Sequence, residues 1–445
     1  MTVLREKAYG TQHPLILRAK AAMKPIKIAI IGAGPKAAAI AARAACLNAV
    51  RKNDLRVTIF EKHHPGANWT GRYGYTDGDQ RLCTPAERDV GFPYSAGYDA
   101  RIAHMLQAHF SWQSYLVETS AYAGWVNKGR LKPSHRKFAD YIKHCIETSK
   151  AQVVRGEVRK LLDKKSHWNI EFNDAEHNSV SQKRGFDAVV ITGTGPASQR
   201  FPAVKDRRFL NGVSFWKSLK AIPELVKDKD DQIVIVGSGG TAAAIAGWLT
   251  RMHIDRSIFI LGSQASMFAR VDNSFENELF TDTTLWQSLS NDDRRKFTER
   301  LNRGAVWTNV LEELSRSDNV RYVAGSAIEV AEDDSNKDVL RVSYRRSVDS
   351  LLTTAESINY LRASLVINTT GFNDLWFKSL LQPDLQLEIK NSDDVQDRLS
   401  DSLAFPFSNA PPLHLPMLSQ VRSPAFTSLM ALGAMADSIL TDYAL

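Results

Sequence analysis

Short apolar runs alternate with longer amphipathic stretches along this chain, which is typical of parallel sheets covered by helices. Two of the runs, KIAII at 27–31 and QIVIV at 232–236, precede glycine-rich turns and then alanine-rich stretches with helical character. Two further runs, FDAVVIT at 186–192 and LVINTTG at 365–371, resemble each other, and each follows one of these units. The pattern therefore predicts an α/β fold with two Rossmann-like dinucleotide-binding domains.

The two turns read GAGPKA from Gly32 and GSGGTA from Gly237. Glycine lets such a turn close tightly and lets the backbone approach a pyrophosphate, which then sits at the N-terminus of the following helix. One turn of this kind is a weak signal. Two of them, each between a strand and a helix, indicate two dinucleotides and favour electron transfer between them.

The strand after each turn distinguishes the two ligands. The first strand, RVTIFEK, contains Glu61 at its end, and a carboxylate there can accept hydrogen bonds from a ribose diol, as FAD or NAD requires. The second strand, SIFILGS, ends at Gly262 without an acid. Three arginines lie near it in the sequence, Arg251, Arg256 and Arg270. An arginine without a competing carboxylate fits the 2′-phosphate of NADP, although each one alone could equally be solvated surface.

The same pattern divides the chain into an FAD site followed by an NADPH site. Residues 24–210 and 362–445 are expected to form a discontinuous FAD-binding domain, with residues 211–361 inserted as the NADPH-binding domain. Polar residues 271–318 interrupt the second unit with helical periodicity, which predicts a small helical insertion. Residues 1–23 lack a sustained apolar run, so we expect a mobile N-terminal extension rather than a secretory signal.

Composition and charge narrow the class of protein. A net charge of +8 over 445 residues, without basic runs interleaved with aromatics, suits anionic cofactors and not nucleic acid. The three cysteines form no CxxC, zinc spacing or disulfide framework, which favours a reducing cytoplasm and argues against a disulfide reductase. No metal site is expected, because none of the eleven histidines has ligand spacing. The most apolar stretch, 26–50, carries three basic residues, so no membrane-spanning helix is expected.

Four stretches resemble the class B flavin-dependent N-hydroxylating monooxygenases, the lysine and ornithine N-hydroxylases of siderophore synthesis. They read GANWTGRYGYTDGDQRLCTPAERDVGFPY from Gly66, FSWQSYL from Phe110, VDNSFENELF from Val271 and ERLNRGAVWTNVLEEL from Glu299. The combination of Asp272, Ser274, Asn277 and Glu278 is fairly specific to that family. The resemblance covers nearly the whole chain from about residue 24 and is closest to the mycobactin-type lysine N-hydroxylase branch.

The resemblance implies roles for individual residues. FAD would be lined by Gly32, Gly34, Pro35, Glu61, Lys62, Trp69 and Gln80. NADPH would be held by Gly237, Ser238, Gly239, Thr241 and Arg270. The substrate would be positioned by Asn277 and Asn302, in the helical insertion that would bind it, and by Arg88. Arg88 stands where the family usually has a lysine that pairs with the substrate α-carboxylate, and arginine keeps that charge with a different reach.

Several of these roles have structural alternatives. Arg88 could pair with Asp89 or Glu87 on the surface. Asn277 could cap a helix, since asparagine is favoured there. Trp69 could be core packing. These alternatives are decided by tertiary contacts, which the sequence alone does not give.

The resemblance also implies a reaction. NADPH would reduce FAD, and the reduced flavin would react with O2 to give a flavin 4a-hydroperoxide. The side-chain amine of L-lysine would then take up the distal oxygen and become a hydroxylamine, for siderophore biosynthesis. Because the ordinary pKa of that amine is about 10.4, a dry site must lower it. An N-hydroxylase of ornithine or a diamine, or an uncoupled NADPH-oxidising flavoprotein, is the alternative, and a dimer or tetramer is left open.

Overall fold

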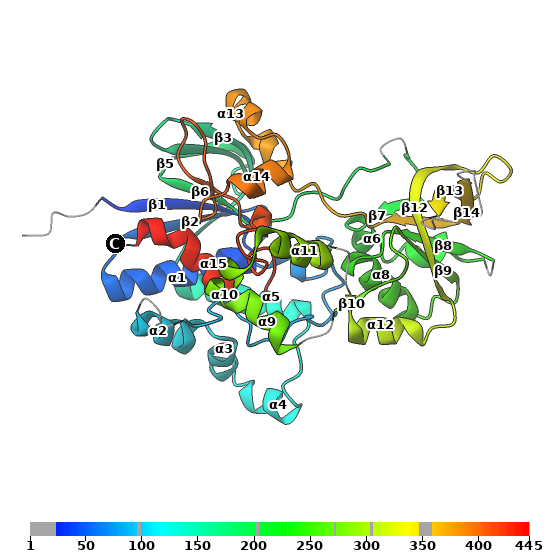
Figure 1. Cartoon of the computed structure of the whole chain (residues 1–445), viewed down its shortest axis with the longest axis horizontal. Coiled ribbons are helices and arrows are strands. Elements are labelled where there is room, and N and C mark those ends of the chain that lie inside the picture. The colour runs from blue at the N-terminus through cyan, green and yellow to red at the C-terminus, as the bar shows by residue number, and fades with distance from the viewer. Residues whose placement is uncertain are drawn as a thin grey trace, which may run out of the picture.

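The computed structural model describes residues 24–95, 99–201, 204–228, 230–270, 273–302, 306–346 and 358–444, without the side chains of 302, 307 and 309. The chain forms two lobes, each built on its own sheet with helices packed against it (Figure 1). The prediction of an α/β fold with two Rossmann-like units is confirmed. The prediction of a mobile segment at 1–23 lies outside the described residues.

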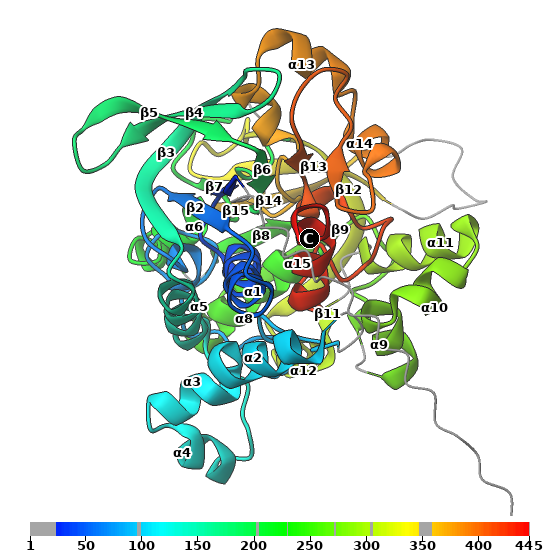
Figure 2. The same ribbon diagram turned by 90° about the vertical axis from the view of Figure 1, so that its left-hand side faces the viewer.

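The first lobe contains an eight-stranded sheet in the order β16-β17-β6-β1-β2-β3-β4-β5. Its strands are β1 (Ile26–Ile31), β2 (Leu55–Glu61), β3 (Gln152–Asp163), β4 (Trp168–Asp174), β5 (Ser179–Phe186), β6 (Ala188–Ile191), β16 (Ala404–Phe405) and β17 (Leu413–His414). β1 lies between β2 and β6 in parallel register. The carboxyl ends of these three strands therefore meet at one edge, where open α/β sheets bind their ligands. β3, β4 and β5 continue the sheet as a twisted antiparallel extension (Figure 2).

Successive residues of β1 alternate between two hydrophobic cores. Ile28 and Ile30 face a helical layer, and Ala29 and Ile31 face the opposite side of the sheet. The helical layer includes α1 (Pro35–Arg51), α2 (Ala100–Phe110), α3 (Trp112–Glu118), α4 (Tyr122–Asn127), α5 (His135–Ser149) and α15 (Leu432–Leu440). The opposite side is covered by α13 (Pro383–Glu388) and α14 (Ser392–Arg398) (Figure 1). Because α15 packs against α1, the C-terminal residues return to the first lobe.

The second lobe contains a seven-stranded sheet in the order β14-β13-β12-β9-β8-β15-β7. Its strands are β7 (Phe209–Asn211), β8 (Gln232–Val236), β9 (Ser257–Gly262), β12 (Val320–Glu332), β13 (Leu340–Arg346), β14 (Ile358–Ala363) and β15 (Leu365–Asn368). Its helices are α6 (Ser214–Lys217), α7 (Ile222–Leu225), α8 (Gly240–Arg251) and α12 (Thr308–Ser315). The predicted boundaries at 210 and 362 fall inside β7 and β14 of this sheet, and β15, predicted to belong to the FAD-binding domain, pairs with β7 and β8 in the second lobe.

The two strands that resemble each other in sequence occupy equivalent places. β6 pairs with β1, and β15 pairs with β8. The threonine after β6, Thr192, donates its hydroxyl to the carbonyl of Ile31 at 2.8 Å. The threonine after β15, Thr369, donates to the carbonyl of Val236 at 2.8 Å. Each threonine therefore lies beside the glycine turn of its own lobe.

The predicted helical insertion consists of α9 (Ser274–Thr281), α10 (Thr283–Ser288) and α11 (Asn291–Asn302). These helices lie against the first lobe although the chain before and after them belongs to the second (Figure 1). Phe280 joins the core around α1, and Trp286 donates its indole N–H to the Val421 carbonyl at 3.2 Å. The flanking strands β10 (Ala269–Arg270) and β11 (Val306–Trp307) pair with each other. α12 packs on α8 instead, so the segment that covers the first lobe ends with α11.

Within the described part of the chain, no helix has both the length and the apolar character that crossing a membrane requires. The apolar residues 26–50 form β1 and most of α1, which are the strand and helix of a nucleotide-binding unit.

Candidate functional site

A cavity of about 360 Å³ lies where the carboxyl ends of β1, β2 and β6 meet the N-terminus of α1. Five of the residues predicted to line FAD contribute to its wall, Gly32, Gly34, Pro35, Glu61 and Trp69. The C-terminal residues 427–429 close another side of it. The geometry therefore brings together segments that are far apart in the chain, at the sheet edge where ligands of this fold class bind.

The turn after β1 has the properties of an anion cradle. Gly32 has φ of +95°, and a Cβ atom there would lie 3.0 Å from the Thr192 hydroxyl, so glycine is required. A Cβ on Gly34, the N-cap of α1, would contact nothing within 4 Å. No side chain caps α1, and its first turn contains no acid. By contrast, α2, α3 and α5 each begin at an Asp or Ser whose side chain accepts an amide N–H. The first amides of α1 therefore suit a pyrophosphate.

Glu61 ends β2 with its carboxylate fixed by two backbone amides. Oε2 accepts from the Ala33 amide and Oε1 from the His63 amide, both at 2.9 Å. Each oxygen keeps a lone pair, which fits a ribose diol. Lys62, the next residue, lies just beyond the end of β2 and does not line the cavity. Its ammonium forms an exposed ion pair with Glu157 at 2.8 Å.

Trp69 is half-buried and contacts both the core and the cavity. Its ring contacts Phe138 in the core, with centroids 5.4 Å apart, and it also lines the cavity. His135 packs edge-on against the same ring at 4.9 Å. Nδ1 of His135 lies 2.8 Å from the Thr76 hydroxyl, and burial lowers the pKa of the imidazole to about 4. The backbone amide of His135 donates to the carbonyl of Gln80, which places that residue next to the start of α5.

The turn after β8 repeats the cradle with one difference. Gly237 has φ of +112°, and a Cβ atom there would lie 2.6 Å from the Thr369 hydroxyl. Gly239 is the N-cap of α8 without a side-chain cap, and Thr241 lies in the first turn, which has no acid. At the end of β9, a Cβ on Gly262 would lie 2.3 Å from the hydroxyl of Tyr322. No carboxylate can occupy the position that Glu61 has in the first lobe. Side-chain atoms of Ser238 lie 2.6 Å from the same Cβ position on Gly262.

The three arginines predicted near this turn have different surroundings. Arg256 donates to backbone carbonyls of the segment before β8. Arg251 forms ion pairs at 3.1 and 3.8 Å with carboxylates of α12 and of the first lobe. Arg270 lies against α9, with Nε 3.8 Å from a Glu276 carboxylate oxygen and its guanidinium 4.8 Å from the Phe280 ring centre. The arginine predicted for NADPH therefore also contacts the helical insertion.

Arg88, predicted to pair with the substrate carboxylate, contacts the chain segment that continues from the wall of the cavity. Its Nη1 donates to the Met430 carbonyl at 3.1 Å, and its guanidinium lies 5.1 Å from the Phe92 ring centre. Met430 directly follows Leu429, which lines the cavity. Asp89, one of the alternative partners of Arg88, is buried and accepts from the Tyr94 hydroxyl and two backbone amides. Burial raises the pKa of this carboxyl to about 6.

Asn277 lies in the second turn of α9 and is half-buried. The cap of this helix is Asn273, whose side-chain oxygen accepts from the Glu276 amide at 2.8 Å. The alternative that Asn277 caps the helix is therefore wrong. Asn302 ends α11, and its side chain lies outside the described residues.

Comparison with known proteins identifies the family. The sequence profile of the L-lysine 6-monooxygenase/L-ornithine 5-monooxygenase family matches residues 106–374. The L-lysine N6-monooxygenase MbtG of Mycobacterium sp. (strain MCS) is 32% identical over 425 residues, covering 93% of this chain and 94% of that protein. The chain belongs to this family. The resemblance predicted from the four stretches is confirmed.

Solved structures agree with this monooxygenase family. The lysine monooxygenase NbtG of Nocardia farcinica has a TM-score of 0.77 at 27% identity, covering 93% of this chain and 99% of NbtG. The ornithine N-hydroxylase KtzI of Kutzneria sp. 744 has a TM-score of 0.74 at 14% identity, covering 94% and 99% of the two chains. At that identity KtzI shows the shared fold alone. The KtzI structure contains reduced FAD, NADP⁺ and L-ornithine.

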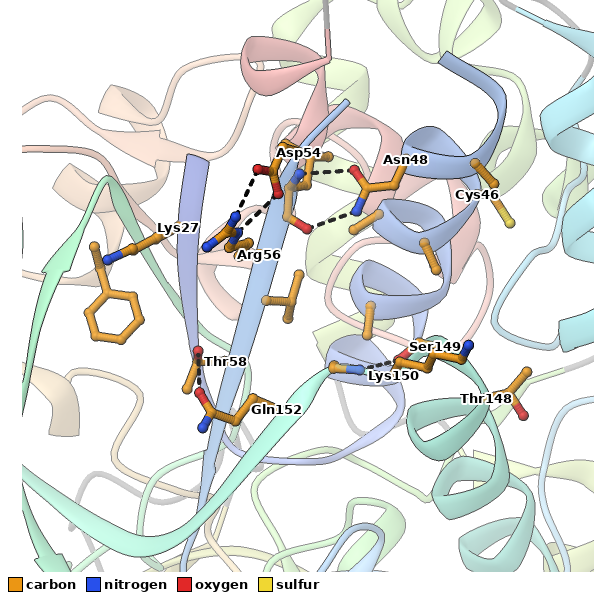
Figure 3. Close-up of a pocket in the computed structure, with 18 of the residues that line it drawn as sticks. Lys27, Cys46, Asn48, Asp54, Arg56, Thr58, Thr148, Ser149, Lys150 and Gln152 are labelled. Atoms are coloured by element: carbon orange, nitrogen blue, oxygen red, sulfur yellow. Dashed lines mark hydrogen bonds and ion pairs between the residues drawn. The ribbon is translucent and has the colours of Figure 1, made fainter. Parts of the chain in front are cut away.

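A wider groove of about 1310 Å³ in this family member lies beside the second half of α1 (Figure 3). Its polar groups satisfy one another: Arg56 pairs with Asp54 at 3.0 Å, and Asn48 exchanges two hydrogen bonds with the Leu55 backbone. Burial raises the pKa of the Cys46 thiol to about 12, so this sulfur is not a nucleophile near neutral pH. Size alone therefore does not make this groove the reactive site.

Lys36 and His135 are among the residues that line the smaller cavity and that sequence analysis did not single out. Lys36 stands inside the predicted turn motif, where a lysine in an otherwise apolar first turn of the helix could have been singled out. His135 follows Ser134, whose side chain caps α5, so its position at the start of a helix could be predicted from the sequence. Its contact with Trp69 could not be, because the two are 66 positions apart in the chain.

Proposed function

We propose that this protein hydroxylates the side-chain amine of L-lysine with FAD, NADPH and O2, for the synthesis of a hydroxamate siderophore. The observation that carries the proposal is the pair of glycine turns that lead into uncapped helices, with the next strand ending at Glu61 in the first lobe and at Gly262 in the second. Relatedness to an L-lysine N6-monooxygenase over 93% of the chain supports the same substrate. A cytoplasmic location is proposed from the three cysteines, all free, of which two are buried.

The described residues fit FAD at the first turn and NADPH at the second. The uncapped amides of α1 would receive the FAD pyrophosphate, and Glu61 would accept from the ribose. The amides of α8 would receive the NADPH pyrophosphate, with Arg270 as the proposed partner of its phosphate. When bound, FAD reduced by NADPH activates O2 for transfer of one oxygen atom. The protein binds and orients the substrate and excludes water from it.

The amine must lose its proton before it can act as a nucleophile. Desolvation disfavours the charged ammonium, so a dry pocket lowers the pKa of a bound lysine side chain. Asn277 is proposed to accept a hydrogen bond from the amine through its side-chain oxygen, which orients the nitrogen lone pair without adding a charge. Arg88 is proposed to pair with the substrate carboxylate, and Asn302 to add a further contact.

Substrate length is the part of the proposal that needs the sharpest test. Lysine and ornithine differ by one methylene, which an apolar pocket discriminates by only about 1–3 kcal/mol. We would measure hydroxylamine and hydrogen peroxide together, with FAD-loaded protein, NADPH, O2 and four amines: lysine, ornithine, cadaverine and putrescine. Hydroxylamine from lysine alone supports the proposal and the carboxylate contact. Peroxide without hydroxylamine from any amine contradicts it.

Asn277→Ala tests the proposed amine contact, and Asn273→Ala is the matched control on the same helix. Losing the contact to the reacting amine is expected to lower kcat/KM for lysine by about 100-fold, near 3 kcal/mol, while FAD remains bound. Losing the cap in Asn273→Ala removes about 1 kcal/mol of helix stability, so kcat/KM should fall far less. Equal losses in the two variants would assign the effect to the helix and not to the amine contact.

A further inference from the structure

Lys36 occupies an electrostatically unfavourable place in the first lobe. It lies in the first turn of α1, where the helix N-terminus already carries partial positive charge. Its side chain is buried, and burial lowers the pKa of the amine to about 7. No carboxylate contacts it within the described residues. A cation in this position is favoured once an anion binds at the same helix N-terminus.

The amine of Lys36 contacts one particular segment of the C-terminal chain. It donates to the carbonyl of Phe426, and to the carbonyl of Ser428 at 3.3 Å. Thr427, Ser428 and Leu429 line the same cavity. An ammonium has three N–H donors, so one remains for a ligand in the cavity. We call residues 426–430 the C-terminal strap.

The far end of the strap contacts Arg88, the proposed partner of the substrate carboxylate. Arg88 donates to the Met430 carbonyl at 3.1 Å. Beyond it, the Gly433 amide donates to the Phe92 carbonyl at 2.8 Å, and a Cβ on Gly433 would lie 2.3 Å from the Gly91 carbonyl. The start of α15, which follows the strap, and the loop that carries Arg88 are therefore packed too closely to move independently.

We propose that Lys36 is a positioning residue that couples the bound FAD to the substrate anchor Arg88 through the C-terminal strap. The inference rests on the proposed function for the identity of the cofactor and of the anchor. With the FAD pyrophosphate at the helix N-terminus, the charged amine is stabilised and holds the two strap carbonyls. The strap then fixes the Met430 carbonyl and, with it, the guanidinium that receives the substrate. Without the pyrophosphate, this chain of contacts loosens.

Hydrogen exchange tests the coupling without any turnover. Amides of residues 425–431 should exchange at least about fivefold more slowly in FAD-loaded than in FAD-stripped wild-type protein, the lower end of typical site-to-site coupling. In Lys36→Met, this FAD-dependent protection should disappear. Lys143→Met, an exposed lysine on α5 that pairs with Glu147, should retain it. FAD-independent exchange of the strap in the wild type would overturn the proposal, and that result needs no variant.

Steady-state kinetics provide the second readout. At saturating FAD, Lys36→Met should raise KM for lysine by about 5- to 150-fold with a much smaller change in kcat and in KM for NADPH. Lys36→Arg, which keeps a cation, should recover part of the lysine KM. A loss of FAD affinity with unchanged lysine KM and unchanged strap exchange would make Lys36 a cofactor contact only. If no amine yields hydroxylamine, the proposed function fails while the exchange result still decides the coupling.

Discussion

The turn after β1 and the turn after β8 share their backbone but differ in the residue that ends the next strand. Both have a glycine at positive φ beneath a threonine hydroxyl, and both lead into a helix without a side-chain cap. In the first lobe the next strand ends in Glu61, held by two amides. In the second lobe the hydroxyl of Tyr322 fills that space beside Gly262. Glycine thus shapes the cradle in both lobes, and the lobes differ in whether a carboxylate stands at the end of the next strand.

The surroundings of the two turns differ as well. The first opens onto a cavity closed by the C-terminal strap, by Trp69 and by His135. The second lies in a lobe whose nearest predicted arginine, Arg270, contacts the helical insertion. The first turn therefore has the character of a resident cofactor site, with a wall drawn from several segments. The second turn is proposed to hold NADPH, a ligand that exchanges in each catalytic cycle.

The largest expected effect comes from valine in place of the positive-φ glycine of each turn. A β-branched side chain is strained there and would collide with the threonine hydroxyl. Gly237→Val should slow NADPH-dependent flavin reduction by about 100-fold or more in stopped flow while the purified protein keeps its FAD. Gly32→Val should instead lose FAD, read from flavin absorbance per protein. Loss of FAD from both variants would show that the two turns are not independent sites.

A second prediction uses the histidines whose pKa is lowered, which in the described residues all lie in the first lobe. The pKa of His135 is about 4 when folded and about 6.5 when unfolded, so only the unfolded chain takes up the proton between these values. Its contribution to stability is therefore complete above pH 6.5 and is lost as pH falls towards 4. Over that window the loss amounts to about 3 kcal/mol.

The variant His135→Gln separates the contribution of His135 to stability from other pH-dependent contributions of opposite sign. Burial raises the pKa of Asp89 and of Asp437 to about 6, and these carboxyls act in the opposite direction over the same pH range. The stability difference between wild type and His135→Gln should therefore shrink between pH 7 and pH 4. Hydrogen exchange of β1 and of β8 at each pH would measure it in each lobe. A pH-independent difference would contradict the lowered pKa.

The smallest of the three effects is expected from Glu61→Gln. The amide keeps one acceptor oxygen but turns its NH2 group towards a backbone N–H that previously had an acceptor. Losing a hydrogen bond to a charged group costs about 1.5–3 kcal/mol, so the Kd for FAD should rise by about 10- to 100-fold. Glu157→Gln, an exposed carboxylate on β3, is the control and should change the Kd by less than about threefold. Equal Kd values in the two variants would remove Glu61 from the FAD site.

Local pattern predicted the strands, the two turns and the helices of the insertion, because each depends on residues within one short window. It predicted neither the burial of Lys36 nor its contact with Phe426, 390 positions away. Nor did it show that α12 packs on α8 while α9 to α11 cover the other lobe, since these contacts join segments that are far apart in the chain. The resemblance grouped Lys62 with Glu61 in the lining of FAD, whereas the Lys62 ammonium pairs with Glu157. These differences all concern contacts made across the chain.

The helical insertion has a consequence for dividing this protein into fragments. A fragment that encodes the second sheet, about residues 204–370, would include α9 to α11 but not the surface that covers them. Phe280 would leave its core, and the indole N–H of Trp286 would lose its acceptor at Val421. Such a fragment would expose the apolar surface of these helices and is expected to aggregate. For protein engineering and for domain exchange between relatives, the insertion must therefore be kept together with the first lobe, although its residues lie within the sequence of the second.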